Sequence, residues 1–368
     1  MIRLGLYGTG NRTKTLLDSL GGDRFYKVHA AYDRNRESAA ALTAKYGGTV
    51  CRSADELADF EGVDAYFISL SPFAHADALR RVIPRGKPVF VEKPVSFSSA
   101  EVDELAGLAE QYRVPVQVGF MRRWLPESIA MLDYIRRNEP GRLFCMDCNW
   151  FHHGDTEMNF NLYHQPDNFR LKVSQIPFHC CHMLDIFLLA GGPVKRVSSQ
   201  LIKVTARPYP SPDDLIANIE FANGANGRFH YSSMVYYTEM SYRFHAENYS
   251  IKMNAGQNQL EIFRRPRFRT SQLGCEPEQR RDFHSFNESY ESFCRPQTVN
   301  FSQSLNVANE NIMYDFVRMV RDGVPPQADL RTAVRVQGLA EAIEASGRLK
   351  HPVELSPVGL PVGLPVGI

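Results

Sequence analysis

The sequence has little of what marks a membrane, nucleic-acid-binding or secreted protein. No apolar stretch is long enough to span a bilayer, and no run of Lys and Arg is present. The formal net charge over 368 residues is only +1, so no strong field favours an acidic partner. A signal-peptide pattern is also missing. We therefore expect a cytoplasmic protein without nucleic-acid or membrane partners.

Cysteine and metal-ligand patterns are equally sparse. The seven cysteines are an odd number and are scattered, unlike a disulfide framework. Cys145 and Cys148 form a CxxC, but they stand in a strand-like run, where side chains alternate between faces and the two thiols point apart. His179, His182 and Asp185 are spaced three residues apart, and ligands that drift around a helix converge poorly. We expect no metal site.

The first 121 residues alternate short apolar runs with helix-like segments. The candidate strands are Leu4–Gly8, Val28–Tyr32, Ala65–Leu70, Val89–Val91 and Val116–Gly119. Helix-like segments lie between them, for example Ser38–Tyr46, Ala76–Ile83 and Ser99–Tyr112. This alternation predicts an α/β domain over residues 1–121, with a doubly wound parallel Rossmann sheet.

The pattern changes after residue 121. Strand-like runs follow one another at Arg142–Phe151, Arg196–Thr205, Leu215–Phe221, Arg228–Ser233, Tyr242–His245, Ser250–Met253 and Gln259–Arg264. Helices are expected at Ser128–Arg137, Phe178–Leu189, Asn306–Arg321 and Thr332–Ser346. We expect an α+β domain over residues 122–350, with a large, mostly antiparallel open sheet. The repeated Pro-Val-Gly-Leu at the end predicts a flexible tail over residues 351–368.

A glycine pair follows the first strand and opens a helix. Gly8 permits a tight turn, and Gly10 lets the backbone approach a pyrophosphate. The N–H groups of Asn11 and Arg12 at the helix start suit that anion. Thr13 stands where the third glycine of the fingerprint is usual. This turn predicts a dinucleotide site.

The second strand ends at Asp33, a little over twenty residues beyond Gly10. A carboxylate there accepts hydrogen bonds from the adenosine ribose and repels a 2′-phosphate, which favours NAD. Arg34 follows at once and suits adenine stacking or a 2′-phosphate, so NADP is the alternative cofactor.

Two charges, Glu92 and Lys93, end the fourth candidate strand and are followed by Pro94. Open α/β sheets bind ligands at this edge, so the pair is expected to face the cofactor cleft rather than to form a surface salt bridge.

At these residues the chain resembles the glucose–fructose oxidoreductase, inositol dehydrogenase and MocA family. The matching segments are Ser71-Pro72, His75, Glu92-Lys93-Pro94 and Gly119 to Trp124 with its Arg123. The resemblance implies that Lys93 lies near the nicotinamide and the reacting hydroxyl and that Glu92 lines the nicotinamide-ribose side. It further implies that Ser71 and Pro72 border the cofactor and that Arg123 frames the cleft.

The helix of the second domain departs from the family pattern. Members often carry Asp-x-x-x-His-x-x-Asp here; His182 and Asp185 match the last two positions, whereas Phe178 replaces the first Asp. Imidazole titrates near neutrality, so His182 suits a general base, while Lys93 offsets alkoxide charge; the reverse assignment stays open. The predicted substrate contacts are Lys93, His153, His179, His182 and Asp185.

These residues support three hypotheses about function. The first is an NAD(P)-dependent dehydrogenase that transfers hydride from a secondary alcohol of a sugar, sugar derivative or cyclic polyol. The second is a glycoside hydrolase or lyase that oxidises its substrate transiently and retains the cofactor; the Phe178 replacement favours it slightly. The third is a dinucleotide-binding sensor without catalysis. A homodimer or homotetramer is expected through the aromatic strands of the second sheet, which carry Phe229, Tyr231, Tyr236 and Tyr237.

Overall fold

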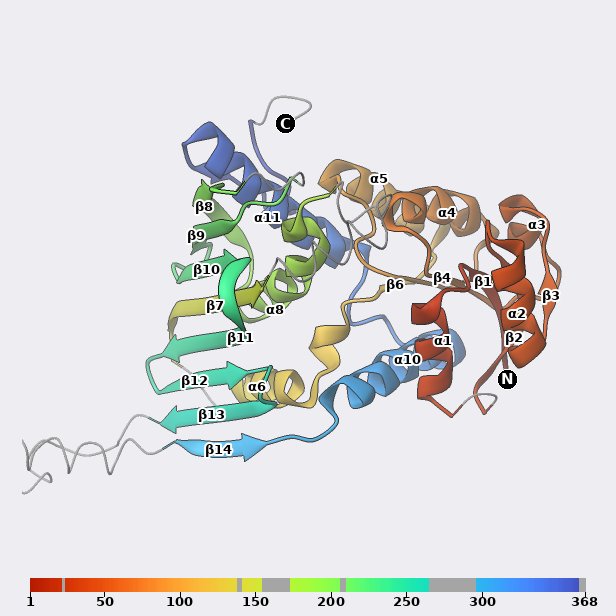
Figure 1. Cartoon of the computed structure of the whole chain (residues 1–368), viewed down its shortest axis with the longest axis horizontal. Coiled ribbons are helices and arrows are strands. Elements are labelled where there is room, and N and C mark those ends of the chain that lie inside the picture. The colour runs from red at the N-terminus through yellow and green to blue at the C-terminus, as the bar shows by residue number, and fades with distance from the viewer. Residues whose placement is uncertain (22–23, 138–140, 154–172, 206–209, 265–295, 364–368) are drawn as a thin grey trace, which may run out of the picture.

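The computed structural model describes residues 1–21, 24–137, 141–153, 173–205, 210–264 and 296–363. Figure 1 shows two β-sheets side by side, each with helices packed on it. The first sheet lies in the red and orange N-terminal part, and the second in the yellow to cyan part. This arrangement confirms the predicted fold class of a Rossmann domain followed by an α+β domain with a large open sheet.

The first sheet has six parallel strands in the order β3-β2-β1-β4-β5-β6. Its strands are β1 (Ile2–Tyr7), β2 (Tyr26–Tyr32), β3 (Thr49–Val50), β4 (Ala65–Ile68), β5 (Val89–Val91) and β6 (Val116–Val118). The helices are α1 (Asn11–Ser19), α2 (Arg36–Tyr46), α3 (Ala54–Ala58), α4 (His75–Val82) and α5 (Ser99–Tyr112). The strand order reverses between β1 and β4, which opens a ligand crevice at their carboxyl ends.

The second sheet has nine strands in the order β14-β13-β12-β11-β7-β10-β9-β8-β15. Its strands are β7 (Leu143–His153), β8 (Val194–Ile202), β9 (Asp214–Phe221), β10 (Asn226–Ser232), β11 (Met234–Ala246), β12 (Tyr249–Asn254), β13 (Gln259–Arg264), β14 (Gln297–Asn300) and β15 (Val353–Glu354). Its neighbouring strands are antiparallel except β7 and β10, which run parallel. A turn at Asn223-Gly224 joins β9 to β10, and Gly224 adopts a positive φ of 81°.

One face of the second sheet is covered by helices. They are α6 (Pro126–Arg137), a π-helical turn η5 (Ile176–Cys180), α8 (Cys181–Gly191) and α11 (Leu330–Leu349). Phe229 and Tyr231 point to this covered face and have no exposed surface. Their expected place in a subunit interface is therefore wrong, because side chains alternate along a strand and these two belong to the core. Tyr236 and Tyr237, by contrast, are 87% and 55% exposed.

The helix α10 (Ser304–Asp322) packs on the first sheet although it follows the second in sequence. The Phe316 ring lies 6.2 Å from that of Phe67 and 5.8 Å from that of Phe90. The chain thus returns to the Rossmann sheet to cover it, and this layer places α10 beside the dinucleotide turn (Figure 1).

The expected flexible tail is wrong for the residues described up to 363. Val353 and Glu354 form β15, which pairs with β8, and Leu355 bridges to Pro361. Gly338 on α11 leaves room for the Gly359 backbone, which a side chain there would block. Over its described residues, 357–363, the Pro-Gly repeat forms a turn with backbone hydrogen bonds from Gly359 N–H to Ser356 and from Val362 N–H to Glu354, both at 2.8 Å, and packs on α11.

None of the helices that the structure describes has the length and apolar character needed to cross a membrane.

Candidate active site

A pocket of about 670 Å³ opens at the carboxyl ends of β1, β2 and β4. It brings together eight of the predicted cofactor residues: Gly8, Gly10, Asn11, Arg12, Asp33, Arg34, Ser71 and Pro72. These residues come from three separate βα turns, which meet because parallel strands present their carboxyl ends at one edge.

The dinucleotide turn uses its two glycines differently. Gly8 has a φ of 92°, and a Cβ there would overlap the Ser69 carbonyl, so this position requires glycine. Gly10 caps α1 without a side-chain bond, and a Cβ built on it meets no atom within 4 Å. Thr13, in place of the third glycine, is buried and donates its hydroxyl to the Gly8 carbonyl at 2.9 Å. The open space at Gly10 fits the approach of a pyrophosphate.

Asp33 is held against the same turn. Its Oδ2 accepts hydrogen bonds from the Thr9 backbone N–H at 2.8 Å and the Thr9 hydroxyl at 2.9 Å, and its Oδ1 accepts from Asn35 N–H at 2.9 Å. A carboxylate lined up with the turn and open to the pocket is suited to ribose hydroxyls. Arg34 beside it is exposed.

Glu92 does not line this pocket, but it is linked to the pocket through Arg12. Its Oε1 accepts from Arg12 Nε at 2.7 Å, and Arg12 Nη1 donates to Asn309 Oδ1 on α10 at 2.8 Å. Gly119 leaves the room for this carboxylate, since a Cβ there would lie 2.9 Å from Glu92 Oε2. Arg12 therefore joins the dinucleotide turn to the end of β5 by an ion pair and to α10 by a hydrogen bond.

Arg123 and Asp185 bind each other rather than a ligand. Arg123 Nε and Nη2 donate to the two Asp185 oxygens at 2.6 and 2.5 Å, and both side chains are buried. Burial opposes the Arg123 charge, but the adjacent carboxylate outweighs it and raises the pKa of Arg123. Arg123 was expected to frame the cleft, and Asp185 was expected to hold the substrate. The structure instead pairs these two side chains with each other, and the bidentate pair uses both carboxylate oxygens of Asp185.

Lys93 extends from the end of β5 to the second domain. Its Nζ donates to the Phe178 carbonyl at 3.0 Å and lies 4.6 Å from the centre of the Phe178 ring. The residue that replaces the usual Asp therefore still holds Lys93, through its backbone oxygen and its aromatic face. The preceding turn is fixed by His75, whose ring nitrogens lie 2.8 and 3.1 Å from the carbonyl oxygens of Pro94 and Leu70.

His182 faces Lys93 from helix α8. Its Nδ1 is buried and has no hydrogen-bond partner among the described residues. Burial, reinforced by the positive charges of Lys93 and Arg122, holds the pKa of His182 well below its ordinary value. The imidazole is therefore neutral at neutral pH, which is the form that accepts a proton.

Sequence reasoning missed the two neighbours that complete this group. Trp150 on β7 stacks on His179, with ring centres 6.0 Å apart and an interplanar angle of 24°. The Arg122 guanidinium lies 5.3 Å from the Trp150 ring centre. The sequence did offer one signal for Trp150: it is an aromatic residue near the end of a predicted strand and is soon followed by His152 and His153. We call Lys93, Arg122, Trp150, Phe178, His179 and His182 the Lys93 cluster.

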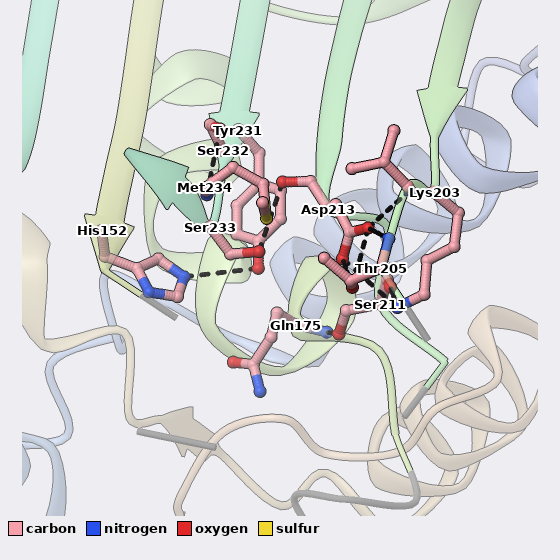
Figure 2. Close-up of polar contacts among 11 residues, drawn as sticks. His152, Gln175, Lys203, Thr205, Ser211, Asp213, Tyr231, Ser232, Ser233 and Met234 are labelled. Carbon is pink, nitrogen blue, oxygen red and sulfur yellow. Dashed lines mark hydrogen bonds and ion pairs between the residues drawn. The ribbon is translucent and has the colours of Figure 1, made fainter. Parts of the chain in front are cut away.

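His153 lies apart from the Lys93 cluster. Its ring lies 5.2 Å from Tyr236 on the outer face of the sheet, whereas His152, one residue earlier, contacts Trp150 and Tyr231 on the helix-covered face. Figure 2 shows His152 pointing towards Tyr231, whose hydroxyl lies 3.3 Å from His152 Nε2. The expected contribution of His153 is thus better suited to His152, because alternation along β7 turns the two rings to opposite faces.

A polar group continues from His152 along the same sheet edge (Figure 2). Asp213 accepts hydrogen bonds from the backbone N–H groups of Val204 and Thr205, both at 2.7 Å. Gln175 N–H donates to the Ser211 hydroxyl at 2.8 Å, while its side-chain oxygen is buried without a partner among the described residues. Among those residues, no three His, Cys, Asp or Glu side chains are grouped to hold a metal ion.

Two family models match the chain in succession. The first, described as an oxidoreductase family with an NAD-binding Rossmann fold, covers residues 2–120. The second, the C-terminal alpha/beta domain of the same oxidoreductase family, covers residues 159–355. The chain belongs to this oxidoreductase family. The resemblance to the glucose–fructose oxidoreductase, inositol dehydrogenase and MocA family is thereby confirmed, and so is the prediction that the first domain binds a nicotinamide dinucleotide.

Several curated proteins of the family match part of the sequence. A rhizopine catabolism protein MocA from Rhizobium meliloti is 28% identical over 146 residues, which is 40% of this chain and 46% of that protein. An inositol 2-dehydrogenase from Acidiphilium cryptum is 34% identical over 148 residues, 38% of this chain and 43% of that protein. The chain spans less than half the length of these curated relatives.

Solved structures match over nearly the whole chain. Levoglucosan dehydrogenase in complex with NADH and L-sorbose superposes with a TM-score of 0.80 at 15% identity, covering 97% of this chain and 100% of that one. The WlbA dehydrogenase from Bordetella pertussis in complex with NADH and UDP-GlcNAcA gives a TM-score of 0.78 at 19% identity, covering 96% and 98%. At these identities the likeness establishes the fold that this oxidoreductase family shares.

Proposed function

We propose that this oxidoreductase oxidises a secondary alcohol of a sugar, sugar derivative or cyclic polyol with NAD⁺ as the hydride acceptor. The observation that carries the proposal is that Lys93, at the end of β5 in the cofactor sheet, donates to the Phe178 carbonyl of the second domain, four residues before His182. NAD⁺ supplies the hydride acceptor when bound, and the pocket at Gly8, Gly10 and Asp33 would hold it.

The protein residues handle the proton and the charge. Neutral His182 takes the hydroxyl proton as the C–H bond breaks, and the Lys93 ammonium orients the alcohol and offsets its developing negative charge. Since Asp185 is engaged by Arg123, it does not orient His182. We place His179 at the side of the substrate, because its ring stacks on Trp150 and adjoins Phe178 at 4.5 Å.

NAD is the proposed preference over NADP. Asp33 presents a carboxylate at the end of β2, where a 2′-phosphate would be repelled. We also propose a homodimer or homotetramer through the outer face of the second sheet, where Tyr236, Tyr237 and Phe144 are exposed. Residence in the cytoplasm stays a prediction.

The test is a screen of sugars, inositols, nucleotide sugars and glycosides for NAD⁺ reduction, followed by NADH absorbance. We expect net NADH with at least one of these classes and a lower rate with NADP⁺. Product release without net NADH would contradict the dehydrogenase and favour transient oxidation.

A further inference from the structure

The charges around the Lys93 cluster do not balance. Two of the nearby carboxylates are already paired, Glu92 with Arg12 and Asp185 with Arg123, while a third, Glu127, is buried and forms no ion pair among the described residues. Lys93 donates to a neutral carbonyl, not to a carboxylate. In the part of the chain that the structure describes, no ion pair is formed by Lys93 or by Arg122.

Arg122 is positioned as an anion receptor. Its guanidinium carbon lies 5.3 Å from the centre of the Trp150 ring, a cation–π contact that leaves N–H groups for other partners. Its Nε is buried without a hydrogen-bond partner among the described residues, and so is the Trp150 Nε1 beside it. A guanidinium held against an aromatic ring, with an unpaired Nε, can bind a carboxylate or phosphate through two parallel hydrogen bonds.

The neighbouring residue shows the contrast. Arg123, next in the same turn η3 (Met121–Trp124), makes a bidentate pair with Asp185. Burial lowers the pKa of Arg122, and the buried Glu127 carboxylate nearby opposes this only weakly and makes no ion pair with it. An unpaired buried cation is costly unless an anion arrives to pair with it.

Phe178 adds to the imbalance. It touches Lys93 through its ring and its backbone oxygen, so the side chain at this position brings no negative charge to the cluster. A neutral alcohol would leave Lys93 and Arg122 without an ion-pair partner among the described residues, whereas an anionic substrate would supply one.

We propose that the substrate is an anionic sugar, and that Arg122 binds its carboxylate or phosphate while Lys93 and His182 engage the hydroxyl to be oxidised. This inference rests on the proposed dehydrogenase function and names its substrate class. Arg122 is then the residue that determines specificity for charge.

The test compares matched sugars on the NAD-loaded protein. For each of glucose, galactose and mannose, binding is measured by calorimetry for the neutral sugar, its uronic acid and its 6-phosphate, and kcat/KM is measured from NADH formation. We expect an anionic member to bind about 10- to 100-fold more tightly than its neutral parent, the range of a charge-assisted contact. The uronic-acid and phosphate arms distinguish which anion is preferred.

Arg122→Gln should remove that advantage, so that the anionic sugar binds no more tightly than its neutral parent. Arg122→Lys keeps the charge and should restore part of it. Arg137→Gln, which removes an exposed guanidinium at the end of α6, is the matched control and should change neither affinity. Equal binding of neutral and anionic partners, or an equal loss for both in Arg122→Gln, would overturn the proposal.

A substitution at Phe178 tests the charge imbalance independently of Arg122. Phe178→Asp gives Lys93 a counter-charge and should reduce the preference for the anion, while Phe178→Asn, without charge, should not. If Phe178→Asp does not fold, the Arg122 variants still decide. If neutral sugars reduce NAD⁺ and anionic sugars do not, the inference of an anionic substrate fails and the proposed function stands. If no sugar reduces NAD⁺, the proposed function fails, and the binding measurements alone decide whether the protein prefers anionic sugars.

Discussion

The cofactor pocket and the Lys93 cluster differ in how their polar groups are satisfied. Around the pocket, Asp33 accepts three hydrogen bonds and Glu92 is paired with Arg12. In the Lys93 cluster, polar atoms of Arg122, Trp150 and His182 are buried without partners among the described residues. The difference teaches that the first region is organised before its ligand binds, whereas the second leaves its polar groups to be satisfied by the substrate.

The largest expected effect follows from breaking a satisfied group. Asp185→Ala leaves the buried Arg123 charge unpaired, and the free energy of unfolding should fall by about 3–5 kcal/mol in urea denaturation. The control is Asp133→Ala, which removes an exposed partner of Arg137 and should cost about 1 kcal/mol or less. If Asp185→Ala were as stable as the wild type, Arg123 would have found another partner. The two regions would then not differ in whether their buried charges are paired.

The Lys93 cluster should show the opposite behaviour. Lys93→Ala and His182→Ala should each lower kcat by about 10²-fold or more, the range for losing a general acid or base, with NAD⁺ affinity nearly unchanged. Initial rates and calorimetry measure the two quantities, and Lys195→Ala, an exposed lysine paired with Glu220, is the control. If His182→Ala keeps wild-type turnover across neutral pH, α8 is structural here and Lys93 becomes the first candidate for the base.

The dinucleotide turn allows cofactor binding to be separated from stability. Gly10→Val should weaken NAD⁺ binding at least tenfold, about 1.4 kcal/mol, because its side chain would occupy the space left for the pyrophosphate. Since a Cβ at Gly10 meets no atom within 4 Å, the melting temperature should change little. Gly10→Ala is the graded comparison with a smaller loss. Unchanged affinity in calorimetry of Gly10→Val would mean that the pyrophosphate lies elsewhere.

The smallest effect concerns pH. The pKa of His182 is depressed in the folded chain, mainly by burial, so below about pH 6.5 the unfolded chain binds a proton that the folded chain does not. Stability from this group is therefore lost as pH falls, by up to about 1.4 kcal/mol per pH unit. His182→Gln lacks this loss and should gain stability relative to the wild type between about pH 7.5 and 5.5.

Urea denaturation at both pH values measures this difference. His75, whose pKa is also lowered, chiefly by burial, is present in both proteins, so its contribution cancels. A pH-independent difference between the two proteins would show that His182 is solvated rather than desolvated.

Much of the cofactor half could be predicted because its signals are local. A glycine turn after a strand and a carboxylate at the end of the next strand need only a parallel sheet to bring them together, and the pocket contains both. Glu92 was expected at the nicotinamide side, but its partner Arg12 lies 80 positions away and its use in an ion pair has no local signal.

The substrate half was predicted less completely. Lys93 and His182 were expected together, yet Asp185 and Arg123 were expected to face ligands and instead neutralise each other. The choice between His152 and His153 depends on which face of β7 is covered, and that is decided by helices α8 and η5 rather than by the strand itself.

What the sequence by itself determined is the alternation of strands and helices, the glycine positions of the turn and the chemical types available at each strand end. These follow from side-chain periodicity and backbone sterics, which act over a few residues. Only the tertiary structure decided which charges pair and which stay open: Arg123 meets Asp185 across 62 positions and Lys93 meets Phe178 across 85. The physical reason is that the pairing of buried charges depends on which groups the packed sheets bring within hydrogen-bonding distance, and residue spacing along the chain carries no such distance.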